Sequence, residues 1–307
     1  MPEIQVSPDT RRIRFRQPAL SSTLERIRIE KEFSRPDWLD RLSVTEGEYS
    51  LFLQSGSGLS RKNLDPFCFD LGITHENLIS GNIDFRSLSR GNGRIEMPEQ
   101  YRTGAFSTRR AVISFLDGLE SIFDWRWRHS SLKHFGLSED MLGDATKPTS
   151  IRLIEDLAKH AVSTYGLSQH SLFELGSYSM VAHHDCPAGQ EFAKARTVSE
   201  IYERLFGDLL HYFENNSSFT LVKVKPDLCH VEVRSRPDVA TALGVHRIGS
   251  REVCQVRAGI LASLTGYLGL PFADVHELEC MHLGNQRCLI EIDLTRAHRR
   301  WLHKDAS

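Results

Sequence analysis

Apolar residues recur every three or four positions in four stretches of the chain, over residues 105–123, 151–165, 168–180 and 201–213. This period places the apolar side chains on one face of an α-helix. Gly166 directly follows the second stretch, and a glycine there commonly ends a helix. Thr197 and Glu200 have the spacing of a capping box, which opens a helix. The pattern therefore predicts four amphipathic helices.

Two later stretches have the residue types and turns of β-hairpins. Their predicted strands are residues 219–224 with 229–233, and 275–280 with 288–294. Between the hairpins, a fifth helical pattern starts near Cys254 and ends near Gly269. We therefore expect an α+β protein with helices packed on a small antiparallel sheet, and with a C-terminal helix-hairpin module.

The first hundred residues lack a sustained period. Residues 1–45 carry charged stretches at 11–16 and 25–31, and glycines and prolines interrupt the chain from residue 50 to 101. We expect an arm with a helix over 22–33, then short irregular pieces. The predicted organisation is an N-terminal arm and irregular region over 1–104, a main domain over 105–296 and a tail over 297–307.

Composition places the chain among ordinary globular proteins. Of its 307 residues, 40% are hydrophobic and 25% are charged, and the net charge is -2. This balance gives no electrostatic reason to expect binding to nucleic acid or to a membrane surface. No apolar run approaches the roughly 20 residues of a membrane-spanning helix, and the N-terminus is polar, so we expect a cytoplasmic protein. Six cysteines in a chain of this length do not make a disulfide framework.

The helix-hairpin module holds four candidate metal ligands: Cys254, Glu277, Cys280 and Cys288. Cys280 and Cys288 flank the hairpin turn, so antiparallel pairing brings their sulfurs close, and Cys254 closes over them. Three thiolates and a carboxylate form a closed four-coordinate shell that suits structural zinc. The alternative is that these cysteines are small buried apolar residues. Because Glu277 and Cys280 point to opposite faces of a regular strand, the site requires a bulge, or Glu279 or His282 as the fourth ligand.

These residues carry a resemblance. Cys254 at the helix start, Gly259 and Gly266 within it, the Glu277-Leu278-Glu279-Cys280 run, Gly284 and Cys288 resemble the 4-vinyl-reductase-like domain of bacterial activators of aromatic catabolism. In phenol-responsive members of that family, zinc is held by a helix Cys followed by Glu, Cys and Cys at this spacing. The resemblance implies a zinc-stabilised sensor of a hydrophobic or aromatic molecule, used in transcription regulation or signalling. The family's ligand contacts match no local motif here, so the ligand-binding residues stay unknown.

The partner of such a sensor is a further expectation. The order of helices, residues 195–201 and a hairpin also resembles, more weakly, the sensing region of AraC-type regulators. Helix-turn-helix units, an ATPase and a kinase core do not accompany it, so we expect a homodimer whose effector lies in another chain. Trp125 and Trp127 alternate with arginines, but two aromatics after an apolar helix more commonly complete a core than stack on bases.

The remaining candidate chemistry is limited. His183, His184, Asp185 and Cys186 are adjacent, and adjacent side chains do not all converge on one ion, so we interpret them as a polar loop, with a second cofactor site as the alternative. Nucleophile-elbow, zinc-protease and dinucleotide motifs are absent. We expect a non-catalytic sensor with an enclosed apolar pocket. The alternative is a scaffold or tetrapyrrole-related cofactor-delivery protein, with a filled core and an exposed apolar patch; an enzyme ranks third.

Overall fold

The structure is a computed structural model that describes residues 20–56, 58–81, 83, 85, 96–184 and 186–304, without the side chains of Arg61 and residues 300–304. The described residues fall into two compact units. The larger comprises residues 97–135 and 144–304, and the smaller comprises residues 20–96 and 136–143. The charged stretch 11–16, Asp185 and the last three residues lie outside the described residues. The domain limits at residues 104 and 296 stay predictions.

The smaller unit is helical. Its elements are α1 (Leu20–Glu30), α2 (Arg35–Leu42), α3 (Glu46–Ser55), α4 (Arg61–Leu71), α5 (His75–Ser80) and α10 (Glu139–Leu142). Trp38 is fully buried in their core and meets Phe67 edge-on. The helix expected over 22–33 is present as α1, but where short irregular pieces were expected after it, the described residues up to Ser80 form helices. No helix between residues 20 and 80 exceeds 11 residues, too short for a sustained period, and Gly56, Gly72 and Gly81 are left-handed helix caps rather than loop residues.

The larger unit contains the predicted helices. They are α8 (Arg109–Ile122), α11 (Arg152–Tyr165), α12 (Gln169–Ser177) followed by α13 (Ser179–His183), and α15 (Val198–Arg204). Thr197 caps α15 by accepting a hydrogen bond from the Glu200 amide, and Gly166 caps α11 in a left-handed conformation. After α15 the chain forms a π-turn, η1 (Leu205–Leu209), and a 3-10 turn, η2 (Leu210–Tyr212). The unit also contains α7 (Glu99–Arg102), α9 (Trp125–His134), α14 (Pro187–Phe192), α16 (Pro237–Leu243) and the short strands β1 (Ser107–Thr108) and β2 (Pro148–Thr149).

Both predicted hairpins are confirmed, and together they form one antiparallel sheet. Its strand order is β3-β4-β6-β5, with β3 at Ser217–Lys225, β4 at Leu228–Ser235, β5 at Asp274–Glu279 and β6 at Cys288–Asp293. Alternate residues of the central strands, such as Val231 and Val233 of β4 and Ile290 of β6, are buried. Helix α18 (Thr295–Lys304) follows where a tail was predicted, because its Ala297 packs into the core. The fold is α+β, as the sequence predicts.

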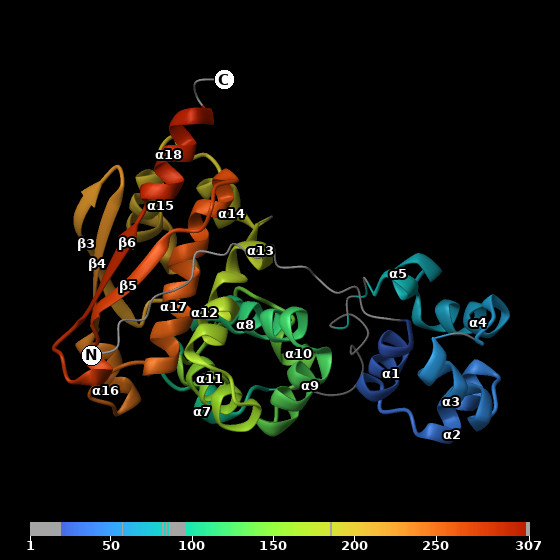
Figure 1. Ribbon diagram of the computed structural model, residues 1–307. Coiled ribbons are helices and arrows are strands. Elements are labelled where there is room, and N and C mark those ends of the chain that lie inside the picture. Colours follow the sequence, from blue (N-terminus) through green and yellow to red (C-terminus); the bar gives the residue numbers. More distant parts are fainter. Residues whose placement is uncertain are drawn as a thin grey trace. The chain divides into compact units, whose positions relative to one another are not determined.

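Helix α17 (Arg251–Ser263) lies between the sheet and helices α11 and α12 (Figure 1). It continues as a 3-10 turn, η3 (Leu264–Leu268), and ends at Gly269. Two glycines allow α12 and α17 to approach closely. A Cβ atom on Gly259 would lie 2.0 Å from the carbonyl oxygen of Phe173, and one on Gly176 would lie 1.9 Å from that of Val256. This contact fixes α17, which carries residues of both sites described below.

Candidate metal centre and adjoining cavity

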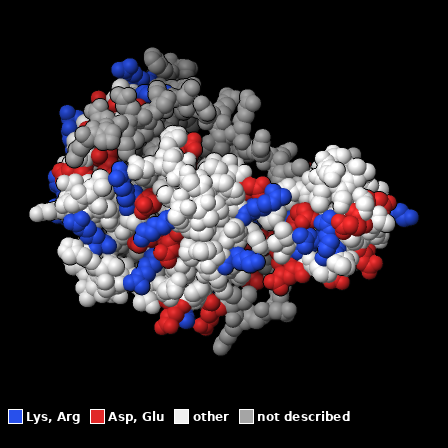
Figure 2. All heavy atoms as spheres, turned by 60° about the horizontal axis from the view of Figure 1, so that its bottom comes forward, with Lys and Arg blue, Asp and Glu red and all other residues white. Residues whose placement is uncertain are grey.

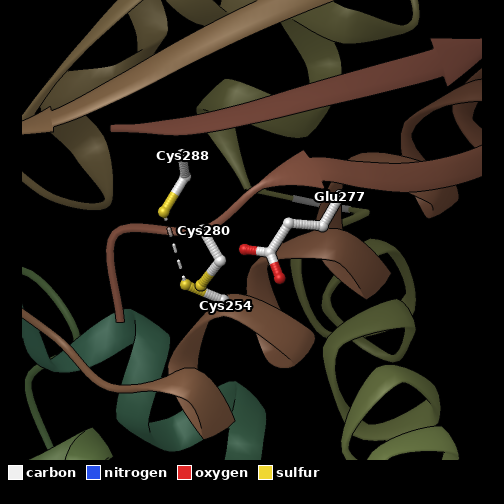
Figure 3. Close-up of side chains that lie close together, drawn as sticks. All are labelled: Cys254, Glu277, Cys280 and Cys288. Atoms are coloured by element: carbon white, nitrogen blue, oxygen red, sulfur yellow. Dashed lines mark hydrogen bonds between the residues drawn. The ribbon is translucent and has the colours of Figure 1, made fainter. Parts of the chain in front are cut away.

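Cys254, Glu277, Cys280 and Cys288 lie together in the larger unit (Figure 3). One ligand atom of each, a sulfur or a carboxylate oxygen, lies within 4.8 Å of the other three. Cys254 is in the first turn of α17, Glu277 is on β5, Cys280 directly follows β5, and Cys288 opens β6. The structure thus brings together the four residues that the sequence singles out.

A β-bulge places Glu277 and Cys280 on the same side of the hairpin. Glu277 pairs with Ile290, and Glu279 pairs with Leu289, so β5 advances two residues where β6 advances one. The extra residue reverses the alternation of the strand, and without it the two side chains would point to opposite faces. The bulge that the sequence required is therefore present.

The two alternatives to Glu277 lie outside the cluster. Glu279 forms an ion pair with Arg287, with Oε2 3.1 Å from Nε, and this hydrogen bond lowers the pKa of Glu279. His282 is half-buried, and burial lowers its pKa, but among the described residues the group of potential ligands does not include it. Glu277 is the carboxylate that the geometry favours.

The separation of the sulfurs suits a tetrahedral ion. Sγ of Cys254 and Sγ of Cys288 are 3.8 Å apart. Two thiolates that each lie ~2.3 Å from a tetrahedral zinc ion are themselves about 3.8 Å apart. The cysteines are free, and this distance is far longer than the ~2.05 Å of a disulfide. The Met281 amide donates a hydrogen bond to Cys288 Sγ at 3.4 Å, which supports a thiolate there.

Without a cation the cluster holds only part of its possible negative charge. Hydrogen bonds to Cys280 and Cys288, with burial, raise the pKa of Cys254, whereas hydrogen bonds from the Cys254 and Cys280 thiols lower the pKa of Cys288. Burial and the neighbouring Cys280 raise the pKa of Glu277 to about 7, and its Oε1 is buried without a hydrogen-bond partner. A divalent cation would let all four groups ionise and would give Oε1 a partner. The donor set therefore fits zinc.

The described residues of the histidine-rich segment, His183, His184 and Cys186, do not come together as a second metal site. His183 lines a cavity, the His184 ring stacks on Tyr267 with centroids 6.1 Å apart, and Cys186 Sγ accepts a hydrogen bond from the Gly189 amide at the start of α14. Within the part of the chain that the structure describes, no group of potential metal ligands includes them. The three side chains have separate roles.

A largely apolar cavity of about 90 Å³ adjoins α17. Val256, Ile260 and Leu264, which recur every four residues along α17 and into η3, line it. Helices α8, α12 and α13, the η1 turn and β3 supply other parts of its wall. A cavity of roughly 150 Å³ holds benzene. This cavity is smaller, so a molecule of the size of benzene fits only if the wall moves, which the flexible side chain of Met180 allows.

His183 brings an unsatisfied polar atom to this cavity. Its residue is only 3% exposed, and its Nε2 has no hydrogen-bond partner. Burial, followed by the charge of Arg110, lowers the pKa of His183 to about 4, so the ring is neutral at pH 7. A neutral imidazole nitrogen exchanges one hydrogen bond with a hydroxyl, carbonyl or amide group. The sequence singled out His183 only within the run of residues 183–186, as part of a polar loop or a second cofactor site, and gave no signal of a place in a cavity wall.

A buried ion pair also lines the cavity. Nη2 of Arg257, one helical turn after Cys254, donates to Glu214 at 3.1 Å and 3.4 Å, and the two side chains are 10% and 18% exposed. The guanidinium carbon lies 5.1 Å from the ring centre of Phe219. Burial lowers the pKa of Arg257, but the charges of Glu214, Cys254 and Cys288 outweigh it, so that the pKa is raised. The guanidinium of Arg257 therefore carries its charge at neutral pH.

The tryptophan-arginine stretch forms α9 and completes packing. Trp125 is buried, and Trp127 stacks on Phe123 with ring centroids 4.4 Å apart. Arg128 is buried and pairs with Asp117. Acidic and basic side chains are interspersed on the face in Figure 2. Among the described helices, none has the length and apolar character needed to cross a membrane.

Comparisons with known proteins give distant likenesses. No family model and no curated protein matches the chain. Solved structures that match include an Fe(II) unliganded H-NOX protein from K. algicida (10% identity, 61% of this chain and 95% of that chain, TM-score 0.43) and an H-NOX protein from S. oneidensis in the Fe(II)NO ligation state (12%, 61% and 98%, 0.46). An oxygen binding H-NOX domain related to soluble guanylate cyclases also matches (12%, 59% and 92%, 0.43). Likenesses at this level support no argument about the function of this chain.

Proposed function

We propose that this protein is a zinc-stabilised, non-catalytic sensor of a small hydrophobic or aromatic molecule. The observation that carries the proposal is the position of α17, which holds Cys254 of the metal cluster and lines the cavity with Val256 and Ile260. A helix held at one end by a metal and exposed to a cavity along its length connects the two sites physically.

In this proposal zinc is held by Cys254, Glu277, Cys280 and Cys288 and has a structural role. Four protein ligands complete a tetrahedral shell and leave no position for a water molecule, which argues against metal catalysis. The ion would tie the start of α17 to the β5-β6 hairpin, and so would hold one wall of the cavity in place. Thiolates kept for a metal suit a reducing compartment such as the cytoplasm.

The ligand would occupy the cavity and use His183. Apolar surface provides most of the contact, and Nε2 of His183 gains the hydrogen-bond partner that it lacks. This arrangement favours a compact, mostly apolar molecule with one hydroxyl, carbonyl or amide group. A scaffold or cofactor-delivery protein would instead have a filled core, and a tetrapyrrole is several times larger than a benzene ring, so the cavity favours the sensor over this alternative.

The output of the sensor would be a population shift. Ligand binding would favour one arrangement of the elements around the cavity and change a surface that contacts a second copy or an effector chain. The π-turn η1 is suited to such a change, because Leu205 and Phe206 line the cavity and π-turns are irregularities often found at functional sites.

Ligand binding is tested by measuring the melting temperature of the zinc-loaded chain with a panel of small uncharged aromatic and aliphatic molecules. A ligand that binds the folded state raises the melting temperature with its concentration. The control is Ala111→Leu, which adds bulk to the cavity wall and should abolish the shift. If no molecule of the panel shifts the melting temperature, or if Ala111→Leu retains the same shift, the cavity is not the binding site.

A further inference from the structure

The charged residues that line the cavity affect which ligands it can bind. The inference drawn from them rests on the proposed function. Among the described residues that line the cavity, Glu214 and Arg257 are the charged pair. Glu214 lies between η2 and β3, 43 residues before Arg257 in the chain, and its carboxylate engages the guanidinium through Nη2. The guanidinium of Arg257 also lies over the aromatic ring of Phe219. The cation of the cavity is thus already paired with an anion of the chain.

An anionic ligand would face two unfavourable interactions. It would compete with Glu214 for the same guanidinium, and it would lie near a second carboxylate in a site largely shielded from water. Two like charges about 4 Å apart at an effective dielectric constant near 20 repel enough to lower affinity on the order of 1000-fold, and the charge of Arg257 is already paired with Glu214. An uncharged ligand meets none of these penalties.

We propose that Glu214 and Arg257 act as a charge filter that admits uncharged small molecules to the cavity and excludes small carboxylates. Glu214 is the residue that determines this specificity. It occupies Arg257, which would otherwise be a ready partner for an aromatic or aliphatic acid. Removing the charge of Glu214 while keeping its shape should therefore turn the cavity into a carboxylate site.

The test compares benzamide with benzoate, two molecules of nearly the same shape that differ in charge. Their dissociation constants are measured by calorimetry at pH 7.5 with the zinc-loaded full chain. For the wild type we expect benzamide to bind at least tenfold more tightly than benzoate. For Glu214→Gln we expect benzoate to bind at least tenfold more tightly than it binds the wild type.

Two further variants identify the residue responsible. Glu214→Gln combined with Arg257→Met should lose the gained benzoate affinity, because the cation is gone. Glu203→Gln removes one exposed carboxylate of α15, which is not part of the cavity wall, and should leave both dissociation constants unchanged.

The filter is overturned if the wild type binds benzoate as tightly as benzamide, or if a folded Glu214→Gln protein gains no benzoate affinity. Should Glu214→Gln fail to fold, the ratio of the wild-type dissociation constants for benzamide and benzoate alone supports or overturns the filter. If the wild type binds neither molecule, benzoate binding by Glu214→Gln supports the filter, and a lack of benzoate binding by this variant overturns it. Suppose that the wild type binds benzamide and benzoate equally tightly, and that Ala111→Leu abolishes benzamide binding. This result would support the cavity as the ligand site of the proposed function and would reject the filter.

Discussion

Replacing His183 by glutamine should remove a pH dependence of folding stability that arises in the cavity wall. Burial and the charge of Arg110 lower the pKa of His183 to about 4 in the folded chain, whereas an unfolded histidine has a pKa of ~6.5. The unfolded state therefore binds more protons than the folded state between these values, and stability falls as the pH falls. The contribution is fully present above pH ~6.5 and is lost progressively toward pH ~4.

The two pKa values set the size of the effect. The full difference corresponds to roughly 3 kcal/mol, of which about 2 kcal/mol falls between pH 7 and pH 5. The residue is only 3% exposed, so solvent screening reduces this little. Urea unfolding at pH 7, 6 and 5 measures it as the free energy of unfolding. The wild type should lose about 2 kcal/mol more than His183→Gln over this range.

The control is His211→Gln, because His211 is exposed and does not line the cavity. It should keep the pH dependence of the wild type. Equal pH dependence in the wild type and in His183→Gln would refute the reasoning, since it would mean that His183 is hydrated or hydrogen-bonded in the folded chain.

Two further pairs of variants test the metal centre and the helix contact. Glu277→Gln should weaken zinc binding at least about tenfold in a competition titration with a chelator, because it removes a charged ligand, whereas Glu279→Gln, two residues away in the ion pair with Arg287, should not; equal affinities would exclude Glu277 as a ligand. Gly259→Ala should lower the free energy of unfolding by about 3 kcal/mol, because its Cβ would overlap the α12 backbone. Gly207→Ala, with open space around its Cβ, should change it by less than about 1 kcal/mol, and a similar loss in both variants would contradict the close helix contact.

The fold of the larger unit could be predicted from local signals. Helical spacing, the Thr197 cap and the two turns each act within a few residues, and they indicated α8, α11, α12, α15, α17, both hairpins and the α+β class. They did not indicate α9, α14, α16 or α18. The helices of the smaller unit after α1 were missed because they are short and their glycines act as caps. A left-handed glycine cap and a loop glycine have the same sequence signature, and only the packing of the helices distinguishes them.

Part of the candidate metal site could also be predicted from local signals in the sequence. Ligand spacing around one turn placed Cys280 and Cys288 together, and the alternation of the strand showed that Glu277 needed a bulge. An apolar pocket was expected, but its lining could not be predicted, because apolar residues that line a cavity and apolar residues that fill a core have the same pattern. The pairing of Glu214 with Arg257 likewise depends on how β3 and α17 pack, over 43 residues of separation.

The measurement that tests the central claim most directly is the zinc content of the purified, zinc-supplied chain, determined by elemental mass spectrometry. We expect about one zinc ion per wild-type chain and per Cys68→Ala chain, because Cys68 lies in the smaller unit. We expect close to none in Cys288→Ala, which loses a thiolate of the cluster. A folded wild-type chain without zinc, or a Cys288→Ala chain that retains it, would contradict the account.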